Sequence, residues 1–169
     1  MWSFRGQSRP DFAATPDAGQ ESVWDYPRPP ALVGCSRAIR VESGGAVIAS
    51  TCRSFRVLET ASPPTFYLPP SSVDASLLVA AGGSSFCEWK GAATYFTLAS
   101  DPDTPVAWCY PHPSPAFSEI RNYLSFYPGR VACFVDDERV RPQAGGFYGG
   151  WITADVVGPF KGDPGTQGW

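Results

Sequence analysis

The sequence lacks the features that mark several large classes of protein. No stretch approaches the roughly 20 apolar residues of a membrane-spanning helix, and residues 1–19 contain no apolar core of signal-peptide length. The 13 Lys and Arg residues are scattered along a chain whose net charge is −3. Because nucleic-acid backbones are bound by clustered positive charge, we expect neither a nucleic-acid partner nor a membrane partner.

The cysteines form neither a zinc knuckle nor a disulfide framework. Their number is odd, and no two have the spacing of a Cys-x-x-Cys pair: Cys35, Cys52, Cys87, Cys109 and Cys133. Zinc sites of the knuckle type need such pairs. The single histidine cannot build a multi-histidine site, and we interpret His112, between two prolines, as a loop residue. We therefore expect no metal, no cofactor and a reducing, cytoplasmic location with free thiols.

Aromatic residues, glycine and proline are abundant instead. The chain has 6 Trp, 7 Tyr and 11 Phe, together with 17 Gly and 18 Pro among 169 residues. This composition is typical of short strands joined by tight turns, and the length suits one domain. We expect an extended arm over 1–20, a single mostly β domain over 21–153 and a Gly/Pro-rich tail over 154–169, with aromatic ends that favour docking of both terminal segments.

Local patterns predict where strands and turns fall. Two hairpins are indicated, one around Ser43-Gly44-Gly45 and one around Asp136-Asp137. Further strands are predicted over 55–60, 93–98 and 106–110. Because prolines bracket 65–68, we expect this short piece at a sheet edge or in a loop.

A single helix is expected after Ser114. This serine is a plausible N-cap and Pro115 occupies the favoured first position. Phe117, Ile120, Leu124 and Tyr127 follow the spacing of one apolar helical face, and Pro128-Gly129 would end the helix. We interpret this face as core packing.

Glu59 and Lys90 are the most informative charged residues. In a strand Glu59 shares a face with Phe55 and Val57, and either face of this strand could be the core one. If the face of Glu59 is buried, its carboxylate needs a cation or hydrogen-bond donors. Lys90, which follows Trp89, is the candidate partner, while a purely structural ion pair is the alternative reading. Cys87 lies three residues before Lys90 and is a weaker candidate nucleophile.

Two glycine-rich segments resemble phosphate loops only superficially. The 145–151 segment, GGFYGGW, lacks the Lys-Ser/Thr of a P-loop, and so does the segment around Lys161. We interpret 145–151 as a tight aromatic corner. Gly82-Gly83 followed by Asp101 and Asp103 faintly matches a nucleotidyltransferase, in which two carboxylates bind Mg²⁺, but this Asp pair flanks a proline in a turn-like loop.

Several longer motifs resemble one known family, domain-of-unknown-function family 427. The segments that carry the resemblance are ESVWDYPRPP (21–30), RVLET (56–60), PPTFYLPP (63–70), CEWKG (87–91), AWCYP (107–111), PQAGGFYGGWIT (142–153) and the tail pieces GPFKG and GTQGW. The resemblance implies a β-tent-like fold, with two small antiparallel sheets and one short covering helix, similar to methionine sulfoxide reductase B and the thalidomide-binding domain of cereblon. It also brings a nucleotidyltransferase-like label without an established activity.

The fold that the resemblance implies suggests an aromatic pocket between the sheets. The residues that we expect to line it are Glu59, Tyr67, Trp89, Lys90 and Trp108. Our first hypothesis is a module, monomeric or homodimeric, that binds a small polar or aromatic molecule there. The second is a small enzyme in which Lys90, Glu59 or Cys87 is the catalytic group. A structural role is favoured only if the terminal segments exchange between subunits.

Overall fold

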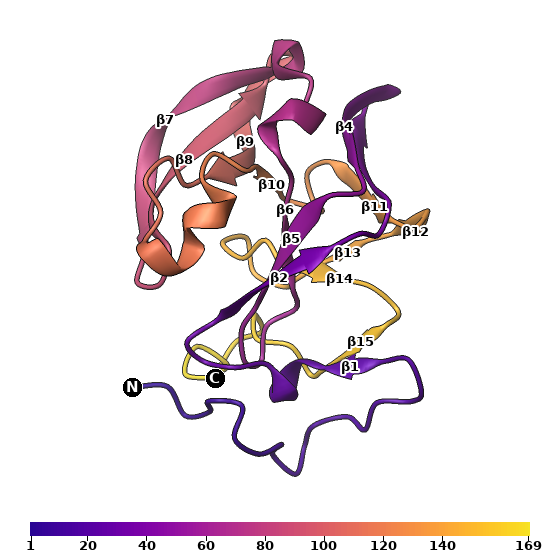
Figure 1. Ribbon diagram of the computed structural model, residues 1–169, viewed down its shortest axis with the longest axis vertical. Coiled ribbons are helices and arrows are strands. Elements are labelled where there is room, and N and C mark those ends of the chain that lie inside the picture. The colour runs from indigo at the N-terminus through magenta and orange to yellow at the C-terminus, as the bar shows by residue number, and fades with distance from the viewer.

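Strands are the main regular secondary structure of the computed structural model, which describes residues 1–169 (Figure 1). The mostly β prediction is therefore confirmed. The strands form several small sheets rather than the two expected: β10-β9-β8-β7, β12-β11-β3-β4 and β2-β5-β6 are antiparallel, β13 pairs with β14, and β1 pairs in parallel with β15. No helix is long and apolar enough to cross a membrane.

The strand bounds follow the chain in order. They are β1 Glu21–Ser22, β2 Ala31–Cys35, β3 Ile39–Ser43, β4 Ala46–Thr51, β5 Ser54–Leu58, β6 Thr65–Tyr67, β7 Leu78–Cys87, β8 Gly91–Leu98, β9 Asp101–Cys109, β10 Ser125–Phe126, β11 Ala132–Val135, β12 Glu138–Arg139, β13 Arg141–Pro142, β14 Trp151–Ile152 and β15 Val156–Val157. Short 3-10 helices cover Val23–Asp25, Pro70–Ser72, Ala75–Leu77 and Pro115–Ile120.

Both predicted hairpins are confirmed, and their turn residues explain them. Gly44 and Gly45 have φ angles of 57° and 81°, and Asp136 and Asp137 have φ angles of 48° and 67°. Tight hairpin turns need this left-handed backbone, which glycine and aspartate tolerate best. The turns join β3 to β4 and β11 to β12. The predicted edge position of 65–68 is also confirmed, since β6 is the last strand beside β5.

The helix predicted after Ser114 is shorter than expected and is not an α-helix. A 3-10 segment, Pro115–Ile120, has non-helical angles at Phe117, and the chain then forms strand β10 against β9. Pro115 does occupy the first turn, but the Ser114 hydroxyl donates to the carbonyl of Trp89 at 2.6 Å instead of capping the helix. The apolar residues of the predicted face are buried or half-buried, as their spacing indicated. The backbone conformation, however, is set by the pairing of β10 with β9.

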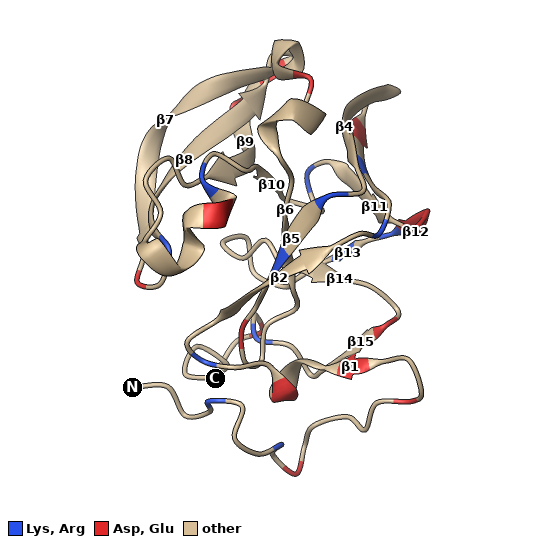
Figure 2. Cartoon of the chain, viewed as in Figure 1, with Lys and Arg blue, Asp and Glu red and all other residues tan.

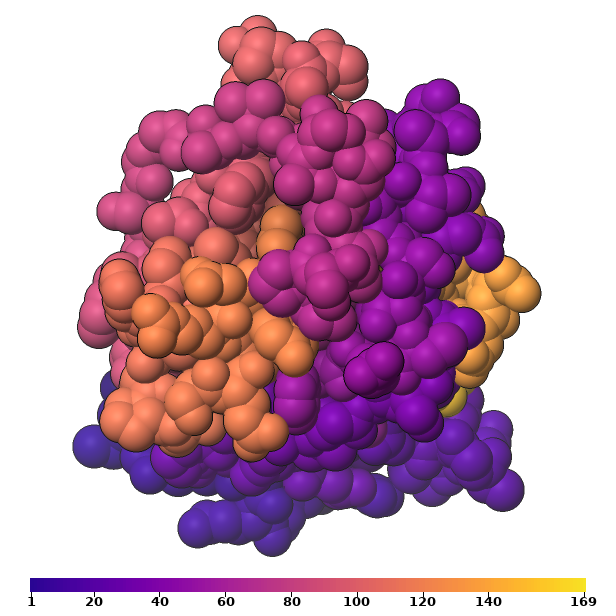
Figure 3. Space-filling view, turned by 45° about the horizontal axis from the view of Figure 1, so that its top comes forward, coloured from indigo at the N-terminus to yellow at the C-terminus, as the bar shows by residue number.

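Both terminal segments lie against the rest of the chain, and their ends are adjacent in Figure 1. Figure 3 shows the N-terminal segment, in indigo, forming one edge of the molecule. Aromatic rings pack the two segments against each other. Phe12 stacks on Trp169 with ring centroids 5.2 Å apart, and the ring centroid of Trp24 lies 5.1 Å from those of Phe12, Trp169 and Phe4. Such contacts bury large apolar area, so the segments complete the domain surface.

The interior is divided into chemically different parts. An aliphatic core lies between β3, β4 and β11 and the sheet of β9, with Ile39, Val41 and Val135 fully buried. A second cluster, called here the aromatic cluster, is centred on Tyr67, Trp108 and partners from β5, β8 and the 3-10 segment. Charged residues are dispersed over the chain without a one-signed run (Figure 2).

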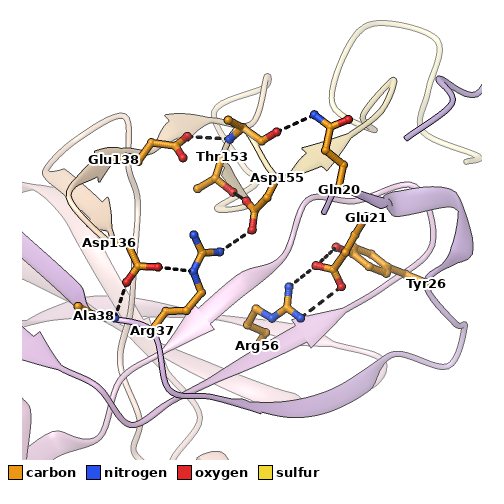
Figure 4. Close-up of polar contacts among 11 residues, drawn as sticks. Gln20, Glu21, Tyr26, Arg37, Ala38, Arg56, Asp136, Glu138, Thr153 and Asp155 are labelled. Carbon is orange, nitrogen blue, oxygen red and sulfur yellow. Dashed lines mark hydrogen bonds and ion pairs between the residues drawn. The ribbon is translucent and has the colours of Figure 1, made fainter. Parts of the chain in front are cut away.

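A network of ion pairs ties the terminal regions to the hairpins (Figure 4). Arg37 donates to Asp136 at 2.8 Å and to Asp155 at 2.5 Å. Arg56 donates to Glu21 at 2.7 Å, which links β5 to β1. Asp155 also accepts a hydrogen bond from Thr153. Each arginine of this network therefore has a carboxylate partner.

Candidate functional site

A cavity of about 430 Å³ opens beside the aromatic cluster, within the size range of small-molecule sites. Its walls combine aromatic rings, two ammonium groups and two carboxylates. Its lining includes Trp2, Glu59, Tyr67, Cys87, Trp89, Lys90, Tyr95, Trp108, Tyr127, Phe147, Tyr148 and Lys161. The cavity thus brings together all five residues expected to line a pocket, and Cys87 with them.

The aromatic walls are fixed by packing and by hydrogen bonds between rings. The indole Nε1 of Trp108 donates to the hydroxyl of Tyr67 at 3.2 Å, and the ring of Trp108 lies 4.6 Å from that of Tyr127. Gly149 allows the loop before β14 to lie on Trp108, because a Cβ at this position would fall 2.1 Å from the indole ring. The predicted aromatic corner therefore closes one side of the cavity.

Several tyrosines contribute side chains to the lining of the cavity. The hydroxyl of Tyr95 lies 2.5 Å from that of Ser85 on the neighbouring strand β7. Burial, together with Tyr95, raises the pKa of Tyr127 to about 12, and burial likewise raises the pKa of Tyr110. These phenols are consequently neutral at physiological pH, so they can donate or accept hydrogen bonds.

Lys90 projects from the turn between β7 and β8 and is buried. The main-chain N–H of Ser114 donates to its carbonyl at 3.0 Å, so the 3-10 segment holds this turn in place. Its Nζ lies 5.7 Å from the ring centre of Tyr110, a cation–π distance. Burial acts to lower the pKa of Lys90, but Tyr67, Cys87 and Glu59 raise it above the ordinary value, and the ammonium stays charged at neutral pH.

Glu59 lines the cavity, but its ion-pair partner differs from the prediction. The structure pairs it with Arg28, whose Nε donates to Glu59 at 3.1 Å, and no carboxylate lies within 4.0 Å of Lys90. Arg28 also donates to the main-chain oxygens of Phe4, Trp169 and Thr60. Val57 and Glu59 line the same cavity, although β5 ends at Leu58 and Glu59 lies just beyond it. The partner was missed because it comes from a distant segment.

Trp2 and Lys161 complete the cavity from the two terminal segments, and the sequence reading did not assign them to it. The Nζ of Lys161 lies 3.9 Å from the ring centre of Trp2, and the guanidinium of Arg28 lies 4.4 Å from the same ring. The indole Nε1 of Trp2 donates to Glu88 at 3.1 Å. The aromatic ends of both terminal segments were the signal that pointed to this docking.

Of the remaining candidates, Cys87 lies at the cavity, whereas Asp101, Asp103 and His112 lie outside it. Asp101 and Asp103 are exposed at the start of β9 and do not line it, and His112 is an exposed loop residue. Cys87 lines the cavity and is partly buried. The paired carboxylates of a nucleotidyltransferase centre therefore have no counterpart in this cavity at Asp101 and Asp103.

Residues 31–137 match a protein family described as a domain of unknown function (DUF427) and named as a nucleotidyltransferase-like group. The chain belongs to this family. A search of curated proteins returned no match. The matched region carries Glu59, Lys90 and most of the aromatic walls, whereas Trp2, Tyr148 and Lys161 lie outside it.

Proposed function

We propose that this member of the DUF427 family is a binding module for a small organic molecule with a flat or cyclic body and a polar edge. The observation that carries the proposal is the aromatic-walled cavity of about 430 Å³ that Lys90 and Glu59 both line. Aromatic faces favour planar ligands, while a few fixed polar groups provide orientation. The five free thiols accord with the reducing, cytoplasmic setting that the sequence predicts.

The rim of the cavity supports the same proposal. Phe86 and Phe147 are 77% and 72% exposed and both line the cavity mouth. Large exposed rings cost solvation free energy, and a ligand entering between them would cover part of that surface. Phe147 also lies edge-on to Tyr148, with ring centroids 5.4 Å apart.

A thermal-shift screen against a library of small metabolites tests the proposal. A ligand at about 100 times its dissociation constant adds about 2.7 kcal/mol to the free energy of unfolding. Binding of a hit should weaken in the Lys90→Met and Phe147→Ser variants. It should persist in Val79→Ser, a matched control that removes an exposed apolar side chain outside the cavity. Unchanged affinity in both folded variants, Lys90→Met and Phe147→Ser, would place the hit outside this cavity and overturn the proposal.

A small enzyme is the second candidate, favoured by the presence of Lys90, Glu59 and Cys87 in one cavity. Lys90 or Cys87 would be the nucleophile, or Glu59 the general base. A reactive thiol must be accessible and ionised. Rapid labelling of Cys87 at neutral pH, compared with the exposed Cys52, would support this candidate, whereas labelling slower than that of Cys52 would remove Cys87 as the nucleophile.

A further inference from the structure

The two lysines of the chain occupy the same cavity. The sequence contains only Lys90 and Lys161 among its 13 basic residues, and the other 11 are arginines. Both lysines are buried, with 8% and 5% of their surface exposed, and both line the cavity beside the aromatic cluster. Lysine is usually an exposed surface residue, so the burial of both in one place sets this cavity apart from the rest of the molecule.

The buried charge of the protein is entirely positive. The buried charged residues are Arg28, Lys90 and Lys161, and no carboxylate is buried with them. Glu59, which is partly exposed, neutralises Arg28 through the 3.1 Å ion pair. It also influences the pKa of both lysines. Glu88 also lines the cavity and acts to raise the pKa of Lys161. Two carboxylates thus face three cations, which leaves a net positive charge, and neither lysine has an Asp or Glu carboxylate within 4.0 Å.

The surroundings of Lys161 show this imbalance directly. No carboxylate lies within 4.0 Å of its Nζ, which contacts the Trp2 ring and, at 3.5 Å, the main-chain oxygen of Trp169. Burial and the neighbouring Arg28 lower its pKa. A buried cation without a full complement of acceptors is costly, and an anion entering the cavity would remove that cost.

We infer that the ligand of this cavity is a small aromatic acid, whose carboxylate or phosphate group is bound by the ammonium groups of Lys90 and Lys161. The inference rests on the proposed binding function and specifies its ligand class. Charge-assisted hydrogen bonds to an anion are about twice as strong as neutral ones. The tyrosine and tryptophan walls would pack on the ring, and the cavity volume suits a body of one or two rings.

Selective ¹³Cε labelling of lysine tests the inference, since the chain will give only two lysine signals. The probes are 4-hydroxybenzoate, indole-3-carboxylate and phenyl phosphate, with 4-hydroxybenzamide and indole-3-carboxamide as neutral matches. We expect saturable shifts of the lysine signals with the acids and at least about tenfold weaker binding of the amides. Comparing phenyl phosphate with the two carboxylates shows which acidic group the site prefers.

Lysine variants then distinguish the contribution of the lysine charge to binding from that of the cavity shape. Lys90→Met and Lys161→Met should each weaken binding of the acids by about tenfold or more, measured by calorimetry, and leave the amides unchanged. Lys90→Arg and Lys161→Arg keep the charge and should retain part of the affinity, which guards against misfolding as the cause. Arg53→Met, an exposed cation outside the cavity, should change nothing.

The outcomes distinguish this inference from the proposed function. Equal affinity for acids and amides, with no effect of the lysine variants, would overturn the anionic ligand and leave small-molecule binding intact. Absence of binding by every acid would overturn the aromatic-acid inference, while the metabolite screen would still decide whether the cavity binds a small molecule at all.

Discussion

The arginines of the network in Figure 4 and the lysines of the cavity differ in whether a carboxylate pairs with the positive charge. In the network, Arg37 and Arg56 each donate to carboxylates at 2.5–2.8 Å in partly exposed positions. In the cavity, Lys90 and Lys161 are more deeply buried and have no carboxylate within 4.0 Å. The charges of the network are therefore paired in direct ion pairs, whereas those of the two lysines are not.

This difference indicates which charges hold the fold and which are available for binding. Arginine is suited to the first role because its planar fork bonds several acceptors at once, and lysine to the second because it is a compact ammonium on a flexible stem. Removing a paired arginine should therefore lower stability, while removing an unpaired lysine should mainly change binding.

The largest effect is expected at Arg28, the buried member of the paired class. Its side chain is 1% exposed and bonds Glu59 and three main-chain oxygens. Arg28→Met would leave these acceptors without donors, so the free energy of unfolding should fall by about 3–5 kcal/mol, as measured by urea denaturation. Arg9→Met, which breaks an exposed pair with Asp25, should cost less than about 1 kcal/mol. Equal losses in the two variants would contradict the distinction.

A smaller, pH-dependent effect is expected in the network at Asp155. Burial acts to raise its pKa, but the Thr153 hydroxyl and Arg37 lower it below the ordinary 3.8. The carboxylate therefore contributes stability that is present above pH 3.8 and is lost as the pH falls through the lower folded-state pKa. Asp155→Asn should be less stable at pH 7 by about 1 kcal/mol, and the gap should narrow in urea titrations below pH 3.8. A gap independent of pH would contradict this assignment.

The smallest effect on stability is expected at Lys161. Lys161→Met loses the cation–π contact with Trp2, which is worth about 0.5–1 kcal/mol. The substitution also removes a buried charge without an ion-pair partner, which favours folding. The free energy of unfolding at pH 7 should therefore change by less than about 1 kcal/mol. Since the folded-state pKa is lowered, the unfolded chain holds the proton more tightly. Wild-type stability should therefore rise relative to Lys161→Met as the pH approaches 10.5. Urea denaturation at pH 7 and 10 measures both effects, and a loss of several kcal/mol would show that Lys161 holds the fold.

The parts of the fold that the sequence predicted well are those decided by neighbouring residues. The hairpins at Gly44-Gly45 and Asp136-Asp137 follow from local backbone preferences, and the edge strand β6 follows from its flanking prolines. The helix after Ser114 failed because β10 pairs with β9, a contact between distant segments that overrides local propensity. Strand β7 was missed because Gly82-Gly83 interrupts it, at a bulge in its pairing with β8.

Some features of the site were likewise predicted from the sequence and others were not. Glu59, Tyr67, Trp89, Lys90 and Trp108 all line the cavity, in the place that the family resemblance suggested. The ion pair of Glu59 with Arg28 could not be predicted, because residues 31 positions apart meet only through the folded chain. Lys161 was missed for a related reason: the Gly/Pro-rich segment that carries it gives no periodic signal, and its backbone is fixed by Ala61 and Gln143.

The confinement of both lysines to one cavity also affects how the protein can be handled. No lysine is exposed on the surface. Lysine amines are therefore not accessible for coupling to a biosensor surface or for the attachment of ubiquitin. Any such modification would have to occur inside the cavity and would occupy it. The outer surface carries its positive charge on guanidinium groups alone, so, apart from α-amino groups, amine chemistry on this protein addresses a single location.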